Sequence, residues 1–155
     1  MSSFIVSVDP GKVSGFAVMS WSGNKDDLPV LEHSSELEVQ DFASDIKVAL
    51  NLSRGLNLTI VCERFTITAQ TTKNSQAPYS LEQIGVLKHL CREFGYDPET
   101  IVFQSPADAK NMFPNPALKK IGTWHVGGAG HAQDAIRHAL LRLTKTGWKP
   151  TILLT

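Results

Sequence analysis

The 155-residue sequence has no long apolar run, few cysteines and no net charge. A helix that crosses a bilayer needs about 20 consecutive apolar residues, and no segment approaches that length. The N-terminus also has no basic region that leads into an apolar segment and a small-residue cleavage site. These absences argue against a membrane-spanning or secreted protein, and we expect a soluble protein of the cytoplasm.

The two cysteines, Cys62 and Cys91, each lie inside an apolar segment of the sequence. They do not have the Cys-x-x-Cys spacing that is typical of zinc sites and redox pairs. Free cysteines behave as small apolar residues and are among the most often buried. The sequence therefore favours two buried thiols over a disulfide or a zinc site, which fits a reducing compartment.

Length and composition are those of one folded unit. A chain of 155 residues with 42% apolar residues is sufficient for one hydrophobic core. There is no internal repeat and no linker, and the low-complexity stretch at 66–78 is short and rich in Thr, Gln, Asn and Ser. We expect residues 1–155 to form a single domain.

The zero net charge hides an uneven distribution of charged residues. Residues 1–50 contain three basic and eight acidic side chains, whereas residues 110–155 contain a single acid, Asp134. Basic residues dominate DNA affinity by neutralising phosphates, so this asymmetry favours a face that binds nucleic acid. The alternative is a solvated helix surface, above all for the last three basic residues. The basic residues of this segment are Lys110, Lys119, Lys120, Arg137, Arg142, Lys145 and Lys149.

The first part of the chain predicts strands and one helix. Apolar runs at 3–8, 15–21 and 29–37 are separated by clusters of turn-forming residues, which predicts a three-stranded antiparallel meander. Apolar residues at helical spacing follow over 39–52, and a buried strand is predicted over 58–63. The helix is then a crossover between parallel strands.

The second part repeats this unit. Residues 80–94 carry an apolar stripe at helical spacing, and 100–104 reads as another strand. A short helix is expected to begin at Ser105, which is followed by Pro106 and an acid at Asp108. Glycines precede a last helix over 131–145. The sequence thus predicts an α/β fold with a mixed five-stranded sheet, three antiparallel then two parallel strands, flanked by helices.

Acidic residues are predicted at the edge of the sheet where such a fold binds ligands. Asp9 and Glu63 follow two strands at their carboxyl ends, where open sheets bind ligands. His131 and Asp134 are three residues apart, so they share one helix face. Several anions in one site resist joint ionisation unless a cation is present, and carboxylates suit Mg²⁺ or Mn²⁺. We expect a divalent metal site, with His131 the weakest ligand because an isolated helix histidine is more often structural.

Four segments of the chain resemble RuvC-type Holliday junction resolvases of the RNase H-like superfamily, particularly the compact bacteriophage members. Family members carry four metal ligands, and the matching positions here are Asp9, Glu63, His131 and Asp134. The third ligand is Asp in many members and His in others. The segments are Ile5-Val-Ser-Val-Asp-Pro-Gly11 with Gly15-Phe-Ala-Val18, Val61-Cys-Glu63, Gln104-Ser-Pro-Ala-Asp-Ala-Lys110, and His131-Ala-Gln-Asp-Ala-Ile-Arg-His-Ala-Leu140.

The resemblance implies an RNase H-like fold and a homodimeric endonuclease that nicks four-way DNA junctions symmetrically in recombination and repair. Two Mg²⁺ ions, with Mn²⁺ as a possible substitute, would flank the scissile phosphate about 3.5–4 Å apart, one activating water and one stabilising the leaving 3′ oxygen. Asp9 would bridge both ions. The setting would be the cytoplasm of a bacterium or of a phage-infected host cell.

The resemblance also implies contacts with branched DNA. Lys110, Lys119 and Lys120 match basic residues that precede the last helix of the family, and would hold the phosphate backbone. Family members often insert an aromatic residue at the junction, and Phe65 is the candidate here. If the strand continued past Glu63, Phe65 would lie on the same face as that residue, so a core position is the alternative. Likewise, the stripe over 80–94 serves either the dimer or the sheet.

Three other functions compete with this one. An Asp-x-Gly turn before a hairpin also opens sugar kinases and actin-like ATPases, but those proteins need a second lobe that 155 residues do not supply. A broader nuclease for flaps and forks would use the same metal site. A non-catalytic protein that binds DNA junctions is the third alternative, against which the retention of all four ligands argues.

Overall fold

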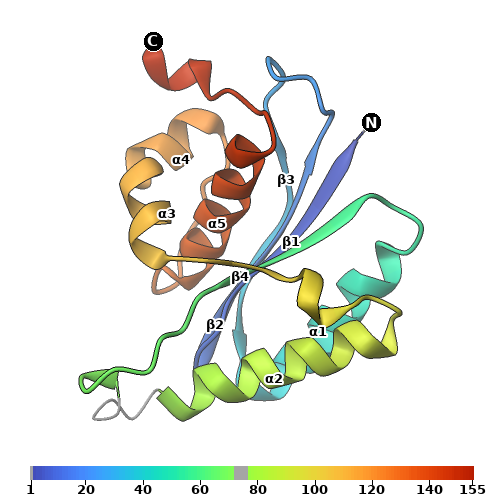
Figure 1. The fold of residues 1–155 in the computed structure, drawn as a ribbon. Helices are drawn as coiled ribbons and strands as arrows, with labels where there is room; N and C mark the ends of the chain where they lie inside the picture. Colours follow the sequence, from blue (N-terminus) through green and yellow to red (C-terminus); the bar gives the residue numbers. More distant parts are fainter. Residues whose placement is uncertain (1, 72–76) are drawn as a thin grey trace.

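The protein forms one mixed β-sheet with helices on both faces (Figure 1). The computed structural model describes residues 2–71 and 77–155, so part of the low-complexity stretch at 66–78 lies outside the described residues. The strand order is β3-β2-β1-β4-β5, with β1 antiparallel to β2, β2 antiparallel to β3, and β4 parallel to both β1 and β5. The predicted sheet is confirmed. Its strands are β1 Ser3–Asp9, β2 Val13–Trp21, β3 Val30–Glu38, β4 Leu58–Glu63 and β5 Val102–Gln104.

The helices form two layers, one on each side of the sheet. Helices α1 and α2 cover one face, and α3, α4 and α5 lie on the other (Figure 1). Their bounds are α1 Val39–Leu52, α2 Ala77–Glu93, α3 Pro106–Met112, α4 Asn115–Ile121 and α5 His131–Lys145, with 3₁₀ turns at Pro98–Thr100 and Thr151–Leu154.

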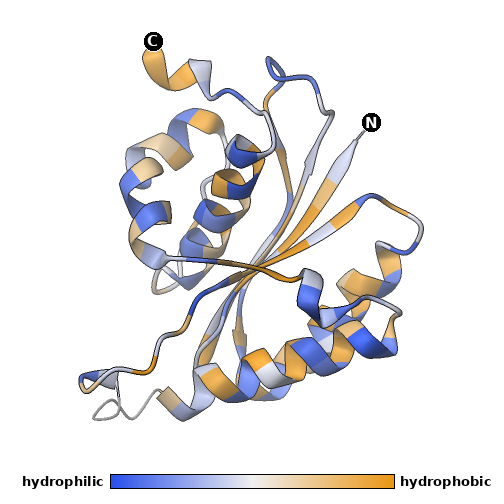
Figure 2. Ribbon diagram, in the orientation of Figure 1, coloured by the Kyte–Doolittle hydropathy of each residue, from blue (hydrophilic) through white to orange (hydrophobic). Residues whose placement is uncertain are grey.

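The central strand β1 is buried from both sides because successive side chains point to opposite faces. Ile5 packs into the core beneath α5, whereas Val6 and Val8 pack into the core beneath α1 and α2. A strand covered on both faces has a nearly continuous apolar sequence, as this one does (Figure 2). The apolar run that predicted the strand therefore also places Asp9 at the end of a rigid, buried element.

Element bounds differ from the expected ones where local turn chemistry intervenes. Strand β5 is shorter than 100–104, because residues 98–100 form a 3₁₀ turn in which the Asp97 side chain accepts a hydrogen bond from the Glu99 backbone. Ser105 is at the N-cap of α3 as predicted, although its side chain makes no capping hydrogen bond. Helix α4 was not predicted.

The expected burial of the two cysteines is confirmed. Cys62 and Cys91 are buried free thiols, and burial raises the pKa of both, that of Cys91 to about 11. The α2 stripe faces the sheet through Leu87 and Leu90, while Leu81 near the start of the helix stays 46% exposed. In the described ranges 2–71 and 77–155, no helix has the length and apolar character needed to cross a membrane.

Candidate metal centre

Three carboxylates from three elements meet at one edge of the sheet. Asp9 ends β1, Glu63 ends β4, and Asp134 lies in the first turn of α5. Strands β1 and β4 are parallel neighbours in which Val8 pairs with Cys62, so the two acids leave the sheet side by side. One carboxylate oxygen from each acid lies within 4.8 Å of the others. The expected convergence of these three side chains is therefore present in the fold.

His131 lies beside this group rather than within it. Its Nδ1 is 3.5 Å from Asp9 Oδ2, and 40% of its side chain is exposed. The hydrogen bond to Asp9 is the main reason that the pKa of His131 is raised. Among the described residues, the set whose ligand atoms all lie within 4.8 Å of one another contains only the three carboxylates. The role of His131 as a fourth ligand stays a prediction.

The electrostatics of the group favour a bound cation. Burial, together with the nearby Glu63 and Asp134, raises the pKa of Asp9 to about 6 against the lowering effect of the His131 hydrogen bond. A carboxyl with a raised pKa is one whose ionised form lacks compensating positive charge. Clustered carboxylate oxygens with an imidazole nitrogen alongside are a donor set that fits Mg²⁺ or Mn²⁺.

Arg137 holds Asp134 in place from inside the protein. Its Nη1 lies 2.6 Å from Asp134 Oδ1, its Nε donates to the Phe113 carbonyl at 2.8 Å, and its Nη2 donates to the Asn115 side chain. Arg137 is only 7% exposed. Counting it among basic residues that face DNA was therefore wrong, because its guanidinium group is buried and bonded to Asp134, the Phe113 carbonyl and the Asn115 side chain.

His138 holds Glu63 in the same way, and it was not predicted as a site residue. Its Nε2 lies 3.0 Å from Glu63 Oε2, and the residue is 1% exposed. On the other side, Gln104 Nε2 donates to the His138 carbonyl at 2.8 Å and lies 3.2 Å from Nδ1. Because Nδ1 faces an amide donor, Nε2 carries the proton and donates to Glu63. The spacing gave a signal, since His138 is one helical turn beyond Asp134.

Helix α5 packs closely against β1 and β2, and this packing brings its first turn to the carboxylates of the two strands. Ser7 Oγ donates a hydrogen bond of 2.7 Å to the Ala135 carbonyl. At Gly15 of β2 a Cβ atom would overlap the carbonyl oxygen of His131, so only glycine permits this approach. Gly15 therefore sets the distance between the helix and the sheet at the level of the site.

The turn before α5 is fixed by Glu36 of β3. Gly127, Gly128 and Gly130 all have positive φ, a conformation that glycine adopts without strain. The backbone N–H of Ala129 donates to Glu36 Oε1 at 2.5 Å, and a Cβ on Gly128 would collide with the same carboxylate. Glu36 also pairs with Gly15 across the sheet. It thus positions the turn that delivers His131 and Asp134, a role that the sequence did not reveal.

Removing this carboxylate is expected to weaken metal binding. Residues that position metal ligands commonly change metal affinity by about 10–100-fold when they are lost. We expect Glu36→Ala to lower Mn²⁺ affinity about tenfold in isothermal titration calorimetry, and Glu36→Gln to retain most of it because the amide oxygen still accepts from Ala129. Glu38→Ala, which removes an exposed acid of the same strand, is the matched control. Unchanged affinity in Glu36→Ala would contradict the positioning role.

The three lysines expected at the DNA lie in different settings. Lys110 is exposed and lines a hollow together with Asp134. Lys119 Nζ lies 4.7 Å from the centre of the Trp124 ring, and Lys120 Nζ donates to the Thr155 carbonyl at 2.6 Å. Lys110 is therefore nearest in structure to the carboxylates, while the other two stand on α4.

Phe65 follows the end of β4 and is not a strand residue. It is partly exposed, and within the described residues it belongs to neither core cluster. The alternative, that Phe65 is a core residue on an extended β4, is therefore wrong. Insertion of Phe65 at a DNA junction stays a prediction.

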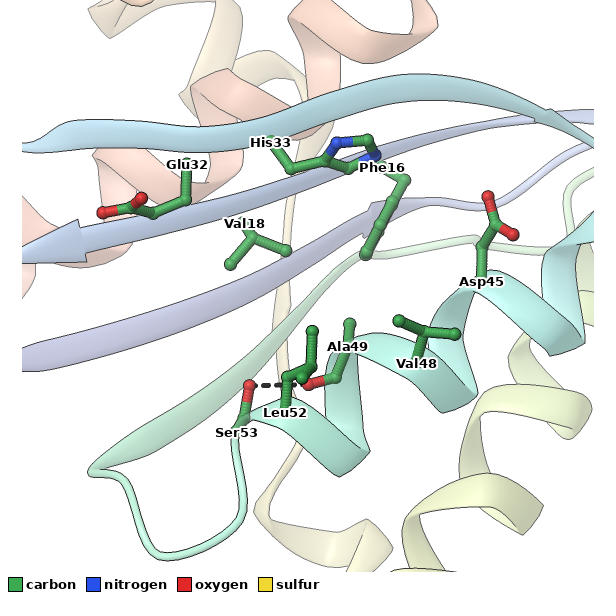
Figure 3. Close-up of a pocket in the computed structure, with 9 residues that line it drawn as sticks. All are labelled: Phe16, Val18, Glu32, His33, Asp45, Val48, Ala49, Leu52 and Ser53. Atoms are coloured by element: carbon green, nitrogen blue, oxygen red, sulfur yellow. Dashed lines mark hydrogen bonds between the residues drawn. The ribbon is translucent and has the colours of Figure 1, made fainter.

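Two hollows meet at Asp134, and a third lies apart from it. The first has a volume of about 420 Å³ and includes Asp9 and His131, and the second has a volume of about 570 Å³ and includes Lys110. The third, of about 440 Å³, is an apolar groove between α1 and strands β2 and β3, where Leu52 faces Val18 (Figure 3). None of the clustered carboxylates lines this groove, so it is not part of the site.

Comparison with known proteins identifies the fold. No protein-family model matches the sequence, and no curated protein matches it significantly. A structure of Thermus thermophilus RuvC in complex with a Holliday junction substrate matches with a TM-score of 0.68 and 17% sequence identity, over 90% of this chain and 91% of that one. A second structure of Thermus thermophilus RuvC matches with a TM-score of 0.69 and 16% identity, over 96% and 99% of the two chains. The chain therefore has a RuvC-type, RNase H-like fold.

Proposed function

We propose that the protein is a divalent-metal-dependent endonuclease that resolves four-way DNA junctions by paired phosphodiester hydrolysis. The observation that supports this most is the meeting of Asp9, Glu63 and Asp134 within 4.8 Å in a fold shared with RuvC. One of the similar RuvC structures is a complex with a Holliday junction substrate, which favours branched DNA as the substrate here.

The proposed metal ligands are the three carboxylates and His131. Divalent ions held there would activate water and stabilise the charge that develops on the leaving 3′ oxygen. Glu63, Asp134 and His131 all act on the pKa of Asp9, which supports Asp9 as the ligand that two ions would share. Arg137 and His138 orient Asp134 and Glu63 through direct hydrogen bonds, which reduces the reorganisation needed when metal and DNA bind.

The proposed DNA contacts follow the basic C-terminal part of the chain. Lys110 lies beside Asp134 and would meet a phosphate next to the cleaved bond, while Lys119 and Lys120 on α4 would meet phosphates further along the strand. Phe65, on the segment that leaves β4 after Glu63, would insert at the junction. A homodimer would supply the second cut, and the natural setting would be the cytoplasm of a bacterium or phage-infected cell.

The test is a comparison of DNA substrates under metal control. Purified protein is incubated with a labelled immobile four-way junction, a flap and a plain duplex, each with Mg²⁺, Mn²⁺ or EDTA. We expect paired nicks on the junction in the presence of Mg²⁺ or Mn²⁺ and none in EDTA. Equal cutting of the flap would support a broader branched-DNA nuclease. Binding without cutting under every metal would leave a non-catalytic junction-binding protein.

A further inference from the structure

The hollow that Lys110 and Asp134 line together has no assigned role. It has a volume of about 570 Å³, within the range of pockets for small ligands, and shares Asp134 with the metal centre. Asp134 also lines the hollow that contains Asp9 and His131, so the two hollows adjoin at this acid. A DNA strand that crossed the metal centre would therefore pass from one hollow into the other. We call the one at Lys110 the Trp124 hollow, which is lined by Lys110, Asn115, Trp124, Gly127, Gly128, Ala129, Gly130, Gln133, Asp134 and Arg137.

Trp124 is the one large aromatic side chain of this hollow. Trp21 and Trp148 are 6% and 2% exposed and belong to the core, whereas Trp124 is partly exposed at the edge of the same core cluster. Lys119 Nζ lies 4.7 Å from its ring centre. Bases stack on such rings irrespective of sequence, because every base has a π-face, and each stack contributes about 1–3 kcal/mol. Lys119 covers one face of the ring, and the other face is the platform for a base that has left the helical stack.

One wall of the hollow, at 127–130, consists mostly of backbone. Residues 127–130 contribute three glycines, and a Cβ atom added at Gly127 or Gly130 would have no neighbour within 4 Å. Gln133 Nε2 donates to the His125 and Gly127 carbonyls at 2.7 and 3.3 Å, which ties this wall to α5. The wall is therefore held in shape before any ligand arrives.

The charge of the hollow suits a phosphate at its rim. Within residues 2–71 and 77–155, Lys110 makes no hydrogen bond or ion pair, and its side chain is exposed. Arg137 is committed to Asp134 and cannot serve this purpose without releasing a metal ligand. Lys110 is therefore the cation of this hollow that is available to a backbone phosphate, while Asn115 adds a polar side chain.

We propose that the Trp124 hollow binds one unstacked nucleotide of the cleaved strand, next to the scissile phosphate. The base stacks on the Trp124 indole, and its phosphate contacts Lys110. This inference rests on the proposed nuclease function and deepens it. Because a base must leave its neighbours to reach the indole, the hollow favours cleavage beside nucleotides that unstack easily, and so contributes to the choice of cleavage site.

The test uses binding of single-stranded DNA in the absence of cleavage. Wild-type protein in EDTA is titrated with a fluorescein-labelled pentathymidine, and Trp124→Leu and Trp124→Phe are compared. We expect about tenfold weaker binding for Trp124→Leu, from the energy of one base stack, and near wild-type binding for Trp124→Phe, which retains an aromatic ring. Equal binding by all three proteins would overturn the proposal.

A second measurement needs no variant and covers the case in which Trp124→Leu does not fold. A pentanucleotide with one 2-aminopurine is added to wild-type protein, and its fluorescence is expected to fall on binding as the base stacks on the indole. Unchanged or increased fluorescence at saturation would overturn the proposal.

Cut positions on junctions with varied arm sequences separate this inference from the proposed function. We expect Trp124→Leu to cut the junction with a broader distribution of sites than wild type. An unchanged distribution would overturn the role of the hollow and leave the nuclease intact. Absence of cutting by the wild type, with binding that still depends on Trp124, would instead reject the nuclease and retain the nucleotide site.

Discussion

Asp9→Asn is expected to abolish metal-dependent cleavage and, at the same time, to stabilise the metal-free protein. The side chain loses the charge that the metal needs but little volume, so the fold and DNA binding should persist. In the absence of metal, burial and two neighbouring acids raise the pKa of Asp9 from 3.8 to about 6. Ionised Asp9 therefore lowers the stability of the metal-free protein, and the neutral amide of Asn at this position removes this destabilisation.

The effect has a defined pH window. A group whose pKa is raised on folding contributes stability below its unfolded value of 3.8, and that stability is lost as the pH rises through about 6. The benefit of Asp9→Asn should thus be small at pH 4 and reach about 2–3 kcal/mol by pH 7.5, from the size of the shift. For a chain of this length that corresponds to a rise in Tm of roughly 4–10 °C.

Thermal unfolding of the wild type and Asp9→Asn in EDTA at pH 4 and pH 7.5 measures this gain in stability. In a parallel scan with Mg²⁺, we expect the wild type to have the higher Tm. Metal should stabilise the wild type and leave Asp9→Asn unchanged. Asp26→Asn, in the exposed turn after β2, is the matched control for loss of one acid. Strong residual cutting by Asp9→Asn would contradict the metal assignment, and a lower Tm in EDTA at pH 7.5 would contradict the electrostatic account.

Gly15→Ala is expected to displace the first turn of α5 from the sheet. Its Cβ would overlap the His131 carbonyl oxygen, and because a Cβ is fixed by its own backbone and the atom it meets is also backbone, no rotamer change relieves the overlap. Overpacking of this kind typically costs about 1–3 kcal/mol, and we expect the upper end here. Because the displaced turn carries His131 and Asp134, metal affinity should fall along with stability.

Gly85→Ala is the control for the same chemical change. Gly85 lies in α2, and an added Cβ there meets nothing within 4 Å. Alanine is the better helix former by up to about 1 kcal/mol, so this variant should be at least as stable as the wild type. Urea unfolding of both variants, with Mn²⁺ titration calorimetry, makes the comparison. Wild-type stability and metal affinity in Gly15→Ala would mean that α5 does not rest on β2 as described.

The periodicity of apolar residues was sufficient to predict most of the helices and strands. It failed where an element is short. The long apolar patterns of β1, α1 and α5 placed these elements to within a residue or two. Helix α4 was missed because Pro114 and Pro116 flank its start and its seven residues complete only two turns. A stretch that short carries too few apolar positions for its period to be recognised.

The sequence predicted the carboxylates that cluster in the structure, but not the residues that hold them in place. Asp9 and Glu63 were found because the ends of parallel strands meet at one edge, a rule that needs only topology. Glu36 and Gln104 act through hydrogen bonds to residues about 30–90 positions away, and no local pattern marks such pairs. Arg137 was misread because charge alone does not show which face of a helix a residue occupies until the helix is docked.

The distance along the chain between Ser7 and Ala135, which are joined by a hydrogen bond, has a consequence for biosynthesis. A ribosome that has made β1 and β4 has produced Asp9 and Glu63, but not the helix that supplies Asp134. The contact between Ser7 and Ala135 closes a long loop of chain. It forms late in folding, because only the docking of α5 offsets the entropy cost of closing that loop. We therefore expect nascent chains that lack α5 to have an incomplete carboxylate cluster, so that the candidate metal centre assembles only after nearly the whole chain has been made.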